Sequence, residues 1–454
     1  RDNGYPLVIA GGPSALNPEP MHEFFDLFLI GEAEDFLLEF IEAYRKHKQD
    51  YRTFKLSKQD LLFSFSELQG VYVPNFYEVN YDLEGRIKEF RLKKEGVPPK
   101  IKKRFVKDFN SSYFPKDWLV PYIQTIHDRV TIEIMRGCPN RCSFCQAKSQ
   151  YYPLRVRSIE NILALAKTSH ERSGYEEVSL TGLSVSDYPK VEKLIEELIG
   201  AFKANGVSVS LPSLKAKAQV GELSSMLASI KKTGLTFAPE AGSQRLRNIL
   251  QKDFDETEFF QMLAGSYACG YQHVKLYFMI GIPFENREDL DGIIDLSIRV
   301  SELRKKVKNV CAQVNISINT LIPKPHTSFQ WFAMEGQENI RKKQDYLKDK
   351  TKNRRLKLNF HNPQMSFLEG VLSRGDRRLA QVVSLAFKKG ARFDAWGNYF
   401  NFEFWSDAFK EYGLDPNFYL KERAQDEIFP WDFIDTGIDK KFLLEEFNKI
   451  IDTS

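Results

Sequence analysis

Cysteines and long apolar runs are the two features that this sequence has least of. Only five cysteines occur in 454 residues, which argues against a disulfide framework and for a reducing compartment. No apolar run is long enough to cross a bilayer and no secretory signal opens the chain, so we expect a cytoplasmic protein without a membrane anchor. The first residue is Arg1 and not Met, from which we expect a fragment or a processed form.

A large charge imbalance is also absent. The formal net charge is +4, with 42% hydrophobic and 28% charged residues, a composition typical of soluble globular proteins. So small a charge permits a nucleic-acid substrate but does not require one. The length is sufficient for two or three domains.

Three of the five cysteines, however, lie within eight residues of one another, at Cys138, Cys142 and Cys145. A β-type run over residues 130–135 leads directly into them. Three thiolates can hold three irons of a cubane, whereas ordinary four-iron clusters take four cysteine ligands. Because the other two cysteines are distant in sequence, the economical interpretation is a cluster with one open iron. The alternative is a zinc site or buried thiols, although zinc sites usually show two separated ligand pairs.

This C-x3-C-x2-C spacing, with the aromatic Phe144 directly before the third cysteine, resembles the signature of the radical S-adenosylmethionine (SAM) superfamily. The resemblance implies that the three cysteines ligate a 4Fe-4S cluster, whose open iron binds the amino and carboxylate groups of SAM. An electron from the cluster then cleaves the sulfonium to give a 5′-deoxyadenosyl radical, chemistry that the cofactors carry and the protein positions. It also implies a partner that supplies electrons, such as flavodoxin or ferredoxin.

Strand-like and helix-like segments alternate from residue 130 to about residue 352. Such alternation predicts an α/β fold with a parallel sheet and helices outside, and the resemblance implies a partial (βα)6 TIM-like barrel. The predicted strands are residues 130–135, 177–181, 207–211, 235–238, 273–280 and 313–321. The predicted helices are residues 159–173, 191–205, 221–232, 243–250, 256–269, 287–305 and 337–352. On the last strand, alternation predicts that Asn315, Ser317 and Asn319 face the interior.

The chemistry of α/β barrels lies at the carboxyl ends of the strands, and the resemblance assigns SAM-binding residues there. After the second strand, Thr181 and Gly182 stand where the superfamily has a Gly-rich turn that binds the amino group, although the usual acidic residue is missing. The alternative is a plain strand-to-helix turn. After the third strand, we expect Ser213 and Lys215 to face the cavity near the methionine carboxylate.

The end of the fourth strand resembles the Gly-Ser segment of the methylthiotransferase and elongator-type branches. A carboxylate and a guanidinium suit the zwitterionic end and the ribose of SAM, so Glu240 and Arg245 are predicted cofactor ligands. Ser243 belongs to the same predicted site and also reads as a helix cap. The alternative is an internal cap and ion pair.

The fifth strand ends in an apolar-Gly-apolar-Pro sequence that is also familiar from the superfamily. There Met279 and Ile280 are predicted to pack against the adenine, and Gly281 to allow its close approach. Two residues are candidates for catalysis: Lys275, an unusual residue on a strand, and His326, a candidate proton donor or acceptor in the loop after the sixth strand. The alternatives are a lysine paired with a core carboxylate and a structural histidine.

Residues 1–47 read as strand, loop, strand and helix, similar to the C-terminal part of the cobalamin-binding domain that precedes many radical SAM barrels. The Gly-Gly-Pro turn at residues 11–13 would lie near the corrin, and the Gly-Glu-x-Glu segment at residues 31–34 would close the domain. We therefore expect an incomplete doubly wound α/β remnant, with cobalamin as an optional further cofactor. A purely structural remnant is the alternative.

Residues 48–129 read as a linker with a small β element, because residues 70–74 and 76–81 alternate like strands of a hairpin or small sheet. Residues 101–109 are basic. We expect a solvated linker surface there, with an RNA-backbone strip as the alternative. The basic side chains are those of Lys102, Lys103, Arg104 and Lys107.

Residues 353–454 are rich in aromatics and read as an α-rich C-terminal capping or docking region, which leaves residues 130–352 for the barrel. The alternative role is stacking of RNA bases, with Arg374, Arg377 and Arg378 on phosphates. The whole pattern resembles uncharacterised radical SAM proteins with a cobalamin-type N-terminal domain.

We therefore expect an enzyme that cleaves SAM reductively and abstracts hydrogen from an unknown substrate. Cobalamin-dependent methyl transfer is one continuation, and RNA or protein modification is another. The alternative is a non-catalytic iron–sulfur or RNA-binding protein on the same scaffold. Formation of 5′-deoxyadenosine separates the two classes.

Overall fold

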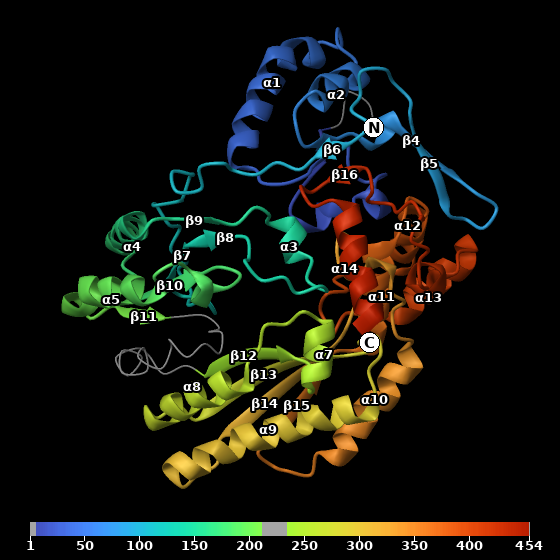
Figure 1. The fold of residues 1–454 in the computed structure, drawn as a ribbon. Helices are drawn as coiled ribbons and strands as arrows, with labels where there is room; N and C mark the ends of the chain where they lie inside the picture. The colour runs from blue at the N-terminus through green and yellow to red at the C-terminus, as the bar shows by residue number, and fades with distance from the viewer. Residues whose placement is uncertain (1–5, 211–233, 454) are drawn as a thin grey trace.

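The computed structural model describes residues 6–210 and 234–453, which form an N-terminal unit, a central α/β part and a C-terminal helical part (Figure 1). In those ranges no helix combines the length and the apolar character needed to cross a bilayer. The predicted helix at residues 221–232 lies outside the described residues, as do Ser213 and Lys215.

The central part contains seven parallel strands within the described residues. They form two sheets, ordered β11-β10-β7 and β12-β13-β14-β15. The strands are β7 (Val130–Glu133), β10 (Glu177–Thr181), β11 (Ser208–Ser210), β12 (Leu235–Glu240), β13 (His273–Ile280), β14 (Gln313–Thr320) and β15 (Leu356–Phe360). The helices of this part are α4 (Ile159–Ser173), α5 (Val191–Phe202), α7 (Gln244–Ile249), α8 (Glu256–Ala268), α9 (Arg287–Lys308) and α10 (Gln337–Lys350).

The α/β class and the parallel sheets are confirmed, whereas the partial barrel stays a prediction. Strands β11 and β12 belong to separate sheets in the described ranges, so a single partial barrel is not observed there. Strand β15 pairs in parallel with β14, so the sheet continues past the boundary predicted at residue 352.

Alternating side chains on the long strands explain how these sheets pack. Along β13, the side chains of Val274, Leu276, Phe278 and Ile280 are buried in the core shared with the helices. The residues between them lie on the opposite face. Strand β14 alternates in the same way, with Val314, Ile316 and Ile318 in that core. The predicted shared face of Asn315, Ser317 and Asn319 therefore lies on the other side of the sheet.

The N-terminal unit is a small mixed sheet covered by two helices. Strand β1 (Ile9–Ala10) runs parallel to β2 (Leu27–Leu29), which pairs antiparallel with β3 (Val71–Tyr72). The helices are α1 (Glu34–Arg52) and α2 (Lys58–Ser66). Only part of the predicted doubly wound pattern is present here, because the third strand of the sheet is antiparallel.

The two segments predicted to pair within residues 70–81 join different sheets instead. The first contains β3 of the N-terminal unit, and the second is β4 (Tyr77–Tyr81), which pairs antiparallel with β5 (Ile87–Leu92). A short 3₁₀ helix redirects the chain between β3 and β4. The 3₁₀ helices are η1 (Pro13–Leu16), η2 (Glu19–Met21), η3 (Pro74–Phe76), η4 (Val185–Asp187), η5 (Lys203–Asn205), η6 (Ser328–Trp331) and η7 (Pro416–Leu420).

The basic segment at residues 101–109 agrees with the predicted solvated surface only in part, because Lys102 and Lys107 are exposed but Lys103 is buried. Strand β6 (Ile101–Lys102) pairs with β16 (Ile434–Asp435) near the C-terminus. Lys103 is only 3% exposed, and its ammonium donates to the backbone carbonyls of Ser149, Gln150 and Tyr152. The segment therefore ties distant parts of the chain together.

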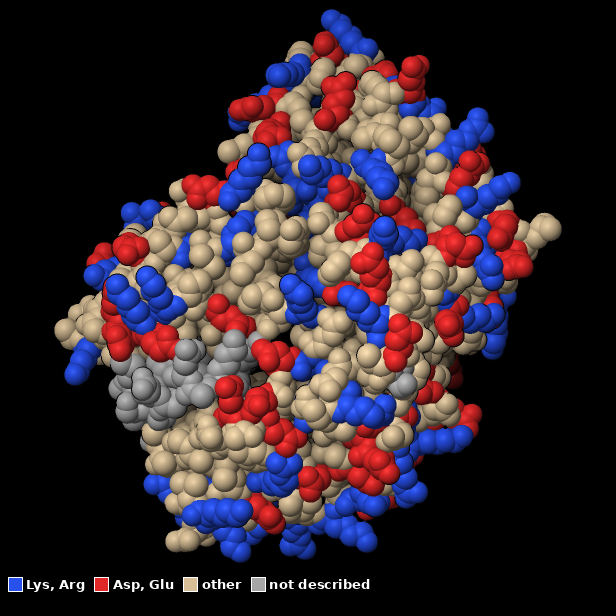
Figure 2. All heavy atoms as spheres, in the orientation of Figure 1, with Lys and Arg blue, Asp and Glu red and all other residues tan. Residues whose placement is uncertain are grey.

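The C-terminal part is helical, as predicted, with α11 (Pro363–Arg374), α12 (Leu379–Lys389), α13 (Phe402–Tyr412) and α14 (Lys440–Thr453). The three arginines predicted to bind phosphates have interaction partners inside the protein. Arg374 is fully buried and donates to four backbone carbonyls, Arg377 pairs with Glu19, and Arg378 pairs with its neighbour Asp376. On the face drawn in Figure 2, basic and acidic side chains are interspersed. The phosphate-binding alternative thus loses the arginines on which it depended.

Candidate active site

The cysteine loop starts where the first central strand ends. After β7 the chain forms β8 (Met135–Arg136), which pairs with β9 (Arg155–Val156). Gly137 then adopts φ +96°, and a Cβ there would lie 2.8 Å from the Leu154 Cα. Glycine is therefore required for the turn that opens the loop.

The three thiols of the loop lie close enough to affect one another. Burial raises the pKa of Cys142 against the opposing charge of Lys252, and together with charge repulsion from Cys145 and Cys138 brings it to about 11. Burial also raises the pKa of Cys145, whereas the backbone N–H groups of Ala147 and Lys148 lower it. Iron replaces these protons when a cluster forms, so three converging thiols fit the predicted ligand set.

A cubane is a different kind of site from a mononuclear one. Within residues 6–210 and 234–453, no three His, Cys, Asp or Glu side chains are grouped as ligands of a single metal ion. Each thiolate of a cubane binds a different iron, so these ligands stand farther apart than the ligands of one ion.

Three distant segments hold the cysteine loop. The N-terminal unit does so through Glu32, whose carboxylate pairs with Arg136 (3.1 Å) and with Arg155 (2.7 Å). Burial opposes ionisation of Glu32, but hydrogen bonds from Arg155 and Val106 and the charge of Arg136 outweigh it and lower the pKa. Glu34 also pairs with Arg136 (2.7 Å). These pairs explain the Gly-Glu-x-Glu segment, which sequence analysis had placed only as the end of a domain.

The other two anchors hold α3 (Ala147–Gln150), the short helix that follows Cys145. The ammonium of Lys103 lies at its C-terminal carbonyls, where a cation is favoured. Lys148 pairs with Glu446 of α14 at 3.2 Å. The first and last parts of the chain therefore both position the loop.

At the end of β10, Thr181 and Gly182 adjoin the cysteine loop. A Cβ on Gly182 would lie 2.7 Å from the Met135 Cγ, so close packing explains this glycine. Just beyond it, the Asp187 carboxylate accepts hydrogen bonds from Ser184 (2.6 Å) and from Asn140 (2.9 Å) of the loop. Sequence analysis noted the missing acidic residue but overlooked Asp187, which reaches this place through a turn of η4.

A cavity of about 550 Å³ opens between the cysteine loop and the ends of β12, β13 and β14. Of the predicted site residues, Phe144, Cys145, Glu240 and Met279 line it. Sequence analysis missed several further lining residues, some of which follow Cys145 or lie on β13 while others come from distant loops and helices. Among these are Gln146, Gln150, Tyr277, Lys324, His361 and Glu369.

Glu240 stands out among the lining residues. Its backbone adopts φ +70° at the end of β12, and its carboxylate lies 3.5 Å from the ammonium of Lys252. Burial raises the pKa of Glu240, while the charge of Lys252 and its hydrogen bond lower it. Lys252 carries no motif signal and could not have been identified from the sequence.

Ser243 and Arg245 have internal partners. Ser243 caps α7 and donates to the Asp289 carboxylate at 2.5 Å. Arg245 pairs with the same carboxylate and donates to the Phe284 carbonyl. Neither is among the described residues that line the cavity. This geometry is the cap and ion pair that we gave as the alternative, and the ligand roles of the two residues stay predictions.

The residues predicted on β13 divide between its two faces. Lys275 and Met279 share the face that leads to the cavity, and the Lys275 ammonium lies 4.6 Å from the centre of the Tyr277 ring. Ile280 is fully buried in the core on the other face, where its side chain cannot reach the adenine site that we predicted. Gly281 has φ +77°, and a Cβ there would crowd Ile340 at 2.8 Å.

His326 does not line the cavity. Its ring is buried, and Nε2 lies 3.0 Å from the Leu16 carbonyl, so this nitrogen carries the proton and donates. Burial lowers the pKa of His326 to about 4. The Ser149 hydroxyl donates to the His326 carbonyl at 2.6 Å. The side chain joins the N-terminal segment to the loop after β14, which is the structural alternative to catalysis.

Two family models match this chain. The model described as "Radical SAM superfamily" matches residues 132–297, and "Radical SAM proteins, N-terminal" matches residues 1–74. An uncharacterized protein, MJ0966 of Methanocaldococcus jannaschii, is 32% identical over 386 residues, which cover 84% of this chain and 74% of that protein. A tRNA-2-methylthio-N(6)-dimethylallyladenosine synthase of Chlorobium phaeobacteroides is 28% identical over 29% of this chain and 31% of its own length.

Solved structures give more distant likenesses. A radical SAM methyltransferase, TsrM from Kitasatospora setae, solved with cobalamin and a 4Fe-4S cluster, has a TM-score of 0.46 at 13% identity. That match covers 68% of this chain and 56% of TsrM. The cobalamin-dependent SAM radical enzyme OxsB, solved with aqua-cobalamin and SAM, has a TM-score of 0.46 at 12% identity, covering 98% of this chain and 66% of OxsB. Likenesses at this distance carry no argument about the site.

The assignment of this chain to a family depends on its sequence similarity to known proteins. The superfamily match contains the cysteine loop and four of the parallel strands, and the MJ0966 match extends over most of both proteins. The predicted cofactors, a 4Fe-4S cluster and SAM, are those of this superfamily of enzymes. The chain belongs to the radical SAM superfamily.

Proposed function

We propose that this protein cleaves SAM reductively at a cluster held by Cys138, Cys142 and Cys145, and abstracts hydrogen from a substrate bound beside it. The observation that carries the proposal is the 550 Å³ cavity into which the cysteine loop opens. It brings Cys145 together with the half-buried carboxylate of Glu240 and with side chains from the ends of three strands. When bound, the cluster and SAM supply the electron and the adenosyl radical; the roles below are those of the protein.

Residues of the cavity are assigned to SAM by their chemistry. Phe144 and Met279 offer apolar surface for the adenine, and the carboxylate of Glu240 accepts hydrogen bonds from hydroxyl or ammonium groups. The backbone at Thr181 and Gly182 is assigned to the amino group, with the nearby Asp187 carboxylate in place of the missing acidic residue.

Cobalamin finds only a partial site in the described residues. A doubly wound domain binds its ligand beyond the carboxyl ends of several parallel strands, whereas the N-terminal unit has the single parallel pair β1–β2. No step is therefore assigned to cobalamin.

The substrate and the electron donor are proposed here by their chemical class. A flavodoxin or ferredoxin would reduce the cluster. The tRNA-modifying relative supports RNA as a candidate substrate class, although the arginines and Lys103 expected to bind phosphates have internal partners. The cytoplasmic location stays a prediction. A non-catalytic iron–sulfur protein remains the second candidate, because the same cysteine loop would hold a cluster without turnover.

The test is anaerobic reconstitution with iron and sulfide, reduction with dithionite, and chromatography for 5′-deoxyadenosine. Cys142→Ala removes a ligand, and Cys269→Ala, which removes a cysteine outside the loop, is the matched control. We expect the product from the wild type and from Cys269→Ala, and none from Cys142→Ala. An intact cluster that binds SAM but yields no product would favour the non-catalytic candidate, and equal cluster content in the Cys142→Ala variant would refute the ligand assignment.

A further inference from the structure

A second cavity, of about 620 Å³, adjoins the first and lies between the N-terminal unit and the C-terminal helices. The two cavities share the lining residues Gln146, Lys324, His361 and Glu369. Gln146 directly follows the cluster ligand Cys145, so this chamber meets the site of radical formation at their common border. The volume suits an organic molecule or a single residue of a larger one.

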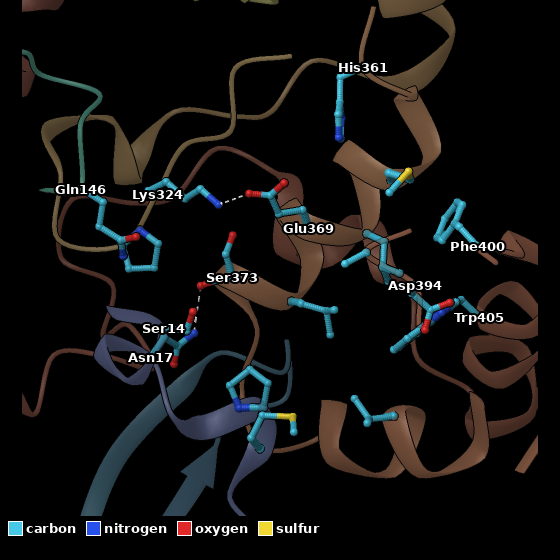
Figure 3. Close-up of a pocket in the computed structure, with 18 residues that line it drawn as sticks. Ser14, Asn17, Gln146, Lys324, His361, Glu369, Ser373, Asp394, Phe400 and Trp405 are labelled. Carbon is cyan, nitrogen blue, oxygen red and sulfur yellow. Dashed lines mark hydrogen bonds and ion pairs between the residues drawn. The ribbon is translucent and has the colours of Figure 1, made fainter. Parts of the chain in front are cut away.

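The walls of the chamber are mostly apolar. Met21, Met365, Leu368 and Phe400 contribute from three separate segments, since Met365 and Leu368 both belong to α11. In Figure 3, Gln146 and Lys324 lie on one side of the chamber, and Asp394, Phe400 and Trp405 lie on the other. A ligand that fills the chamber therefore needs an apolar body with its polar groups at defined ends.

Three polar atoms in these walls lack a hydrogen-bond partner within the described residues. They are Oδ1 of Asp394, Oδ1 of Asn17 and Nε1 of Trp405, each shielded from solvent. Asn17 uses its amide nitrogen for the carbonyls of Ser373 and Gly375, which leaves its oxygen free to accept. Because an unsatisfied buried polar group is costly, these atoms mark where a ligand completes the site.

The charges of the chamber determine which ligand fits. Lys324 and Glu369 form an ion pair at 2.5 Å and neutralise each other, as the dashed line in Figure 3 shows. The carboxylate of Asp394 then remains as the unmatched charge in the lining. The lining also offers two unpaired hydrogen-bond acceptors, on Asp394 and Asn17, but one unpaired donor, on Trp405. It therefore favours a ligand that is rich in hydrogen-bond donors. An aromatic side chain such as Trp405 next to the carboxylate adds attraction for a cation.

We propose that this chamber binds the substrate of the radical reaction, and that the substrate carries a protonated amine on an apolar body. Asp394 binds the amine, Asn17 accepts a second donor, and the Trp405 indole donates to an oxygen or nitrogen of the same molecule. The apolar body then extends toward Gln146, which orients its far end to the neighbouring cavity. This inference rests on the proposed function only in naming the bound molecule a substrate.

The experiment uses the full-length reconstituted protein labelled with 5-fluorotryptophan, and follows its fluorine NMR signals. Three probes share one apolar body and differ in charge: 2-phenylethylamine, 2-phenylethanol and 3-phenylpropionate. Trp405 lines the chamber, and Trp405→Phe assigns its signal. We expect the amine to shift this signal with about tenfold higher affinity than the carboxylate, since a charge-assisted hydrogen bond is gained in one case and repulsion in the other.

Asp394→Asn is the deciding variant, and Asp407→Asn, which removes the same charge from an exposed position on α13, is its control. We expect the amine to lose about tenfold in affinity in the first variant and to bind normally in the second. Because Asp394 Oδ1 has no hydrogen-bond partner in the part of the chain that the structure describes, we expect the substitution to leave thermal stability unchanged. Equal binding of the amine and the carboxylate would overturn the proposal, as would an equal loss in both variants.

Hydroxocobalamin is the competitor. If it displaces the amine and shifts the Trp405 signal, the chamber belongs to the corrin and the proposal fails. Binding of the probes needs no turnover, so the absence of 5′-deoxyadenosine in the same preparation would count against the proposed function alone.

Discussion

The buried imidazole of His326 makes the stability of this protein depend on pH in a defined way. Its pKa is lowered to about 4 in the folded protein, whereas a histidine in an unfolded chain titrates near its ordinary value of about 6.5. As the pH falls below that ordinary value, the unfolded chain binds a proton that the folded protein excludes. Stability is therefore complete above about pH 6.5 and is lost as the pH falls toward 4.

The magnitude follows from the two pKa values. Between about pH 7.5 and pH 5, His326 should remove about 2 kcal/mol from the free energy of unfolding, and about 3 kcal/mol once the pH is below 4. His326→Asn removes the titration and keeps a residue that tolerates the positive φ of this position. Urea unfolding at the two pH values, followed by tryptophan fluorescence, measures the difference. His127→Asn, at an exposed position, is the control.

We expect the wild type and His127→Asn to lose about 2 kcal/mol more than His326→Asn over this interval. Comparing proteins cancels the contributions of the other titrating groups. An identical pH dependence in all three would refute the buried neutral imidazole. If His326→Asn kept its fold but no longer formed 5′-deoxyadenosine, the catalytic prediction would replace the structural one.

Two further substitutions test how the cysteine loop is held. Gly31→Ala would place a Cβ 2.2 Å from the Arg104 carbonyl oxygen at φ +120°, so we expect a loss of roughly 2–4 kcal/mol. The control is Gly200→Ala in α5, where no atom lies within 4 Å of the added Cβ, so the substitution should be neutral or stabilising by up to about 1 kcal/mol. Equal melting temperatures for the Gly31→Ala and Gly200→Ala variants would contradict the close approach of Gly31 to Arg104. Lys103→Met leaves three carbonyls without their donor and should cost about 2–3 kcal/mol more than Lys102→Met at the exposed neighbouring position. Denaturant titration measures this difference, and a Lys102→Met variant as unstable as Lys103→Met would remove the basis for the buried ammonium.

Local patterns predicted the elements of the central part well. The observed bounds of β10, β13 and α4 agree with the predicted ones. For α4 the reasons are visible: Ser158 caps its start, and Gly174 in the left-handed conformation ends it. Alternation of apolar residues also assigned the two faces of β14 correctly. These features depend on neighbours in sequence, and a single sequence therefore contains them.

Features that depend on distant neighbours could not be predicted in this way. Charged residues were the main source of error in these predictions. A lysine within a basic segment is expected to be solvent-exposed unless its interaction partners are known. Lys103 and Arg377 are both satisfied by segments far away in the chain. For Arg245, predicted as a SAM ligand from its chemistry, the sequence did not show that Asp289 lies within ion-pairing distance. Asp394, the residue on which the second cavity depends, has no motif around it.

The pairing of β6 with β16 has a consequence for synthesis of the protein. The backbone N–H of Ile101 donates to the Phe433 carbonyl, and that of Lys103 to the Asp435 carbonyl, so β6 pairs with its partner strand in the described residues only after residue 435 has been made. At ordinary translation rates, the ribosome needs roughly 15 to 65 s to add the residues between these strands. During that time β6 lacks its partner strand, and an unpaired strand edge is a target for chaperones and for aggregation. Strand β16 therefore completes this pairing late, and the cysteine loop is fully held only after Glu446 of α14 has also been made.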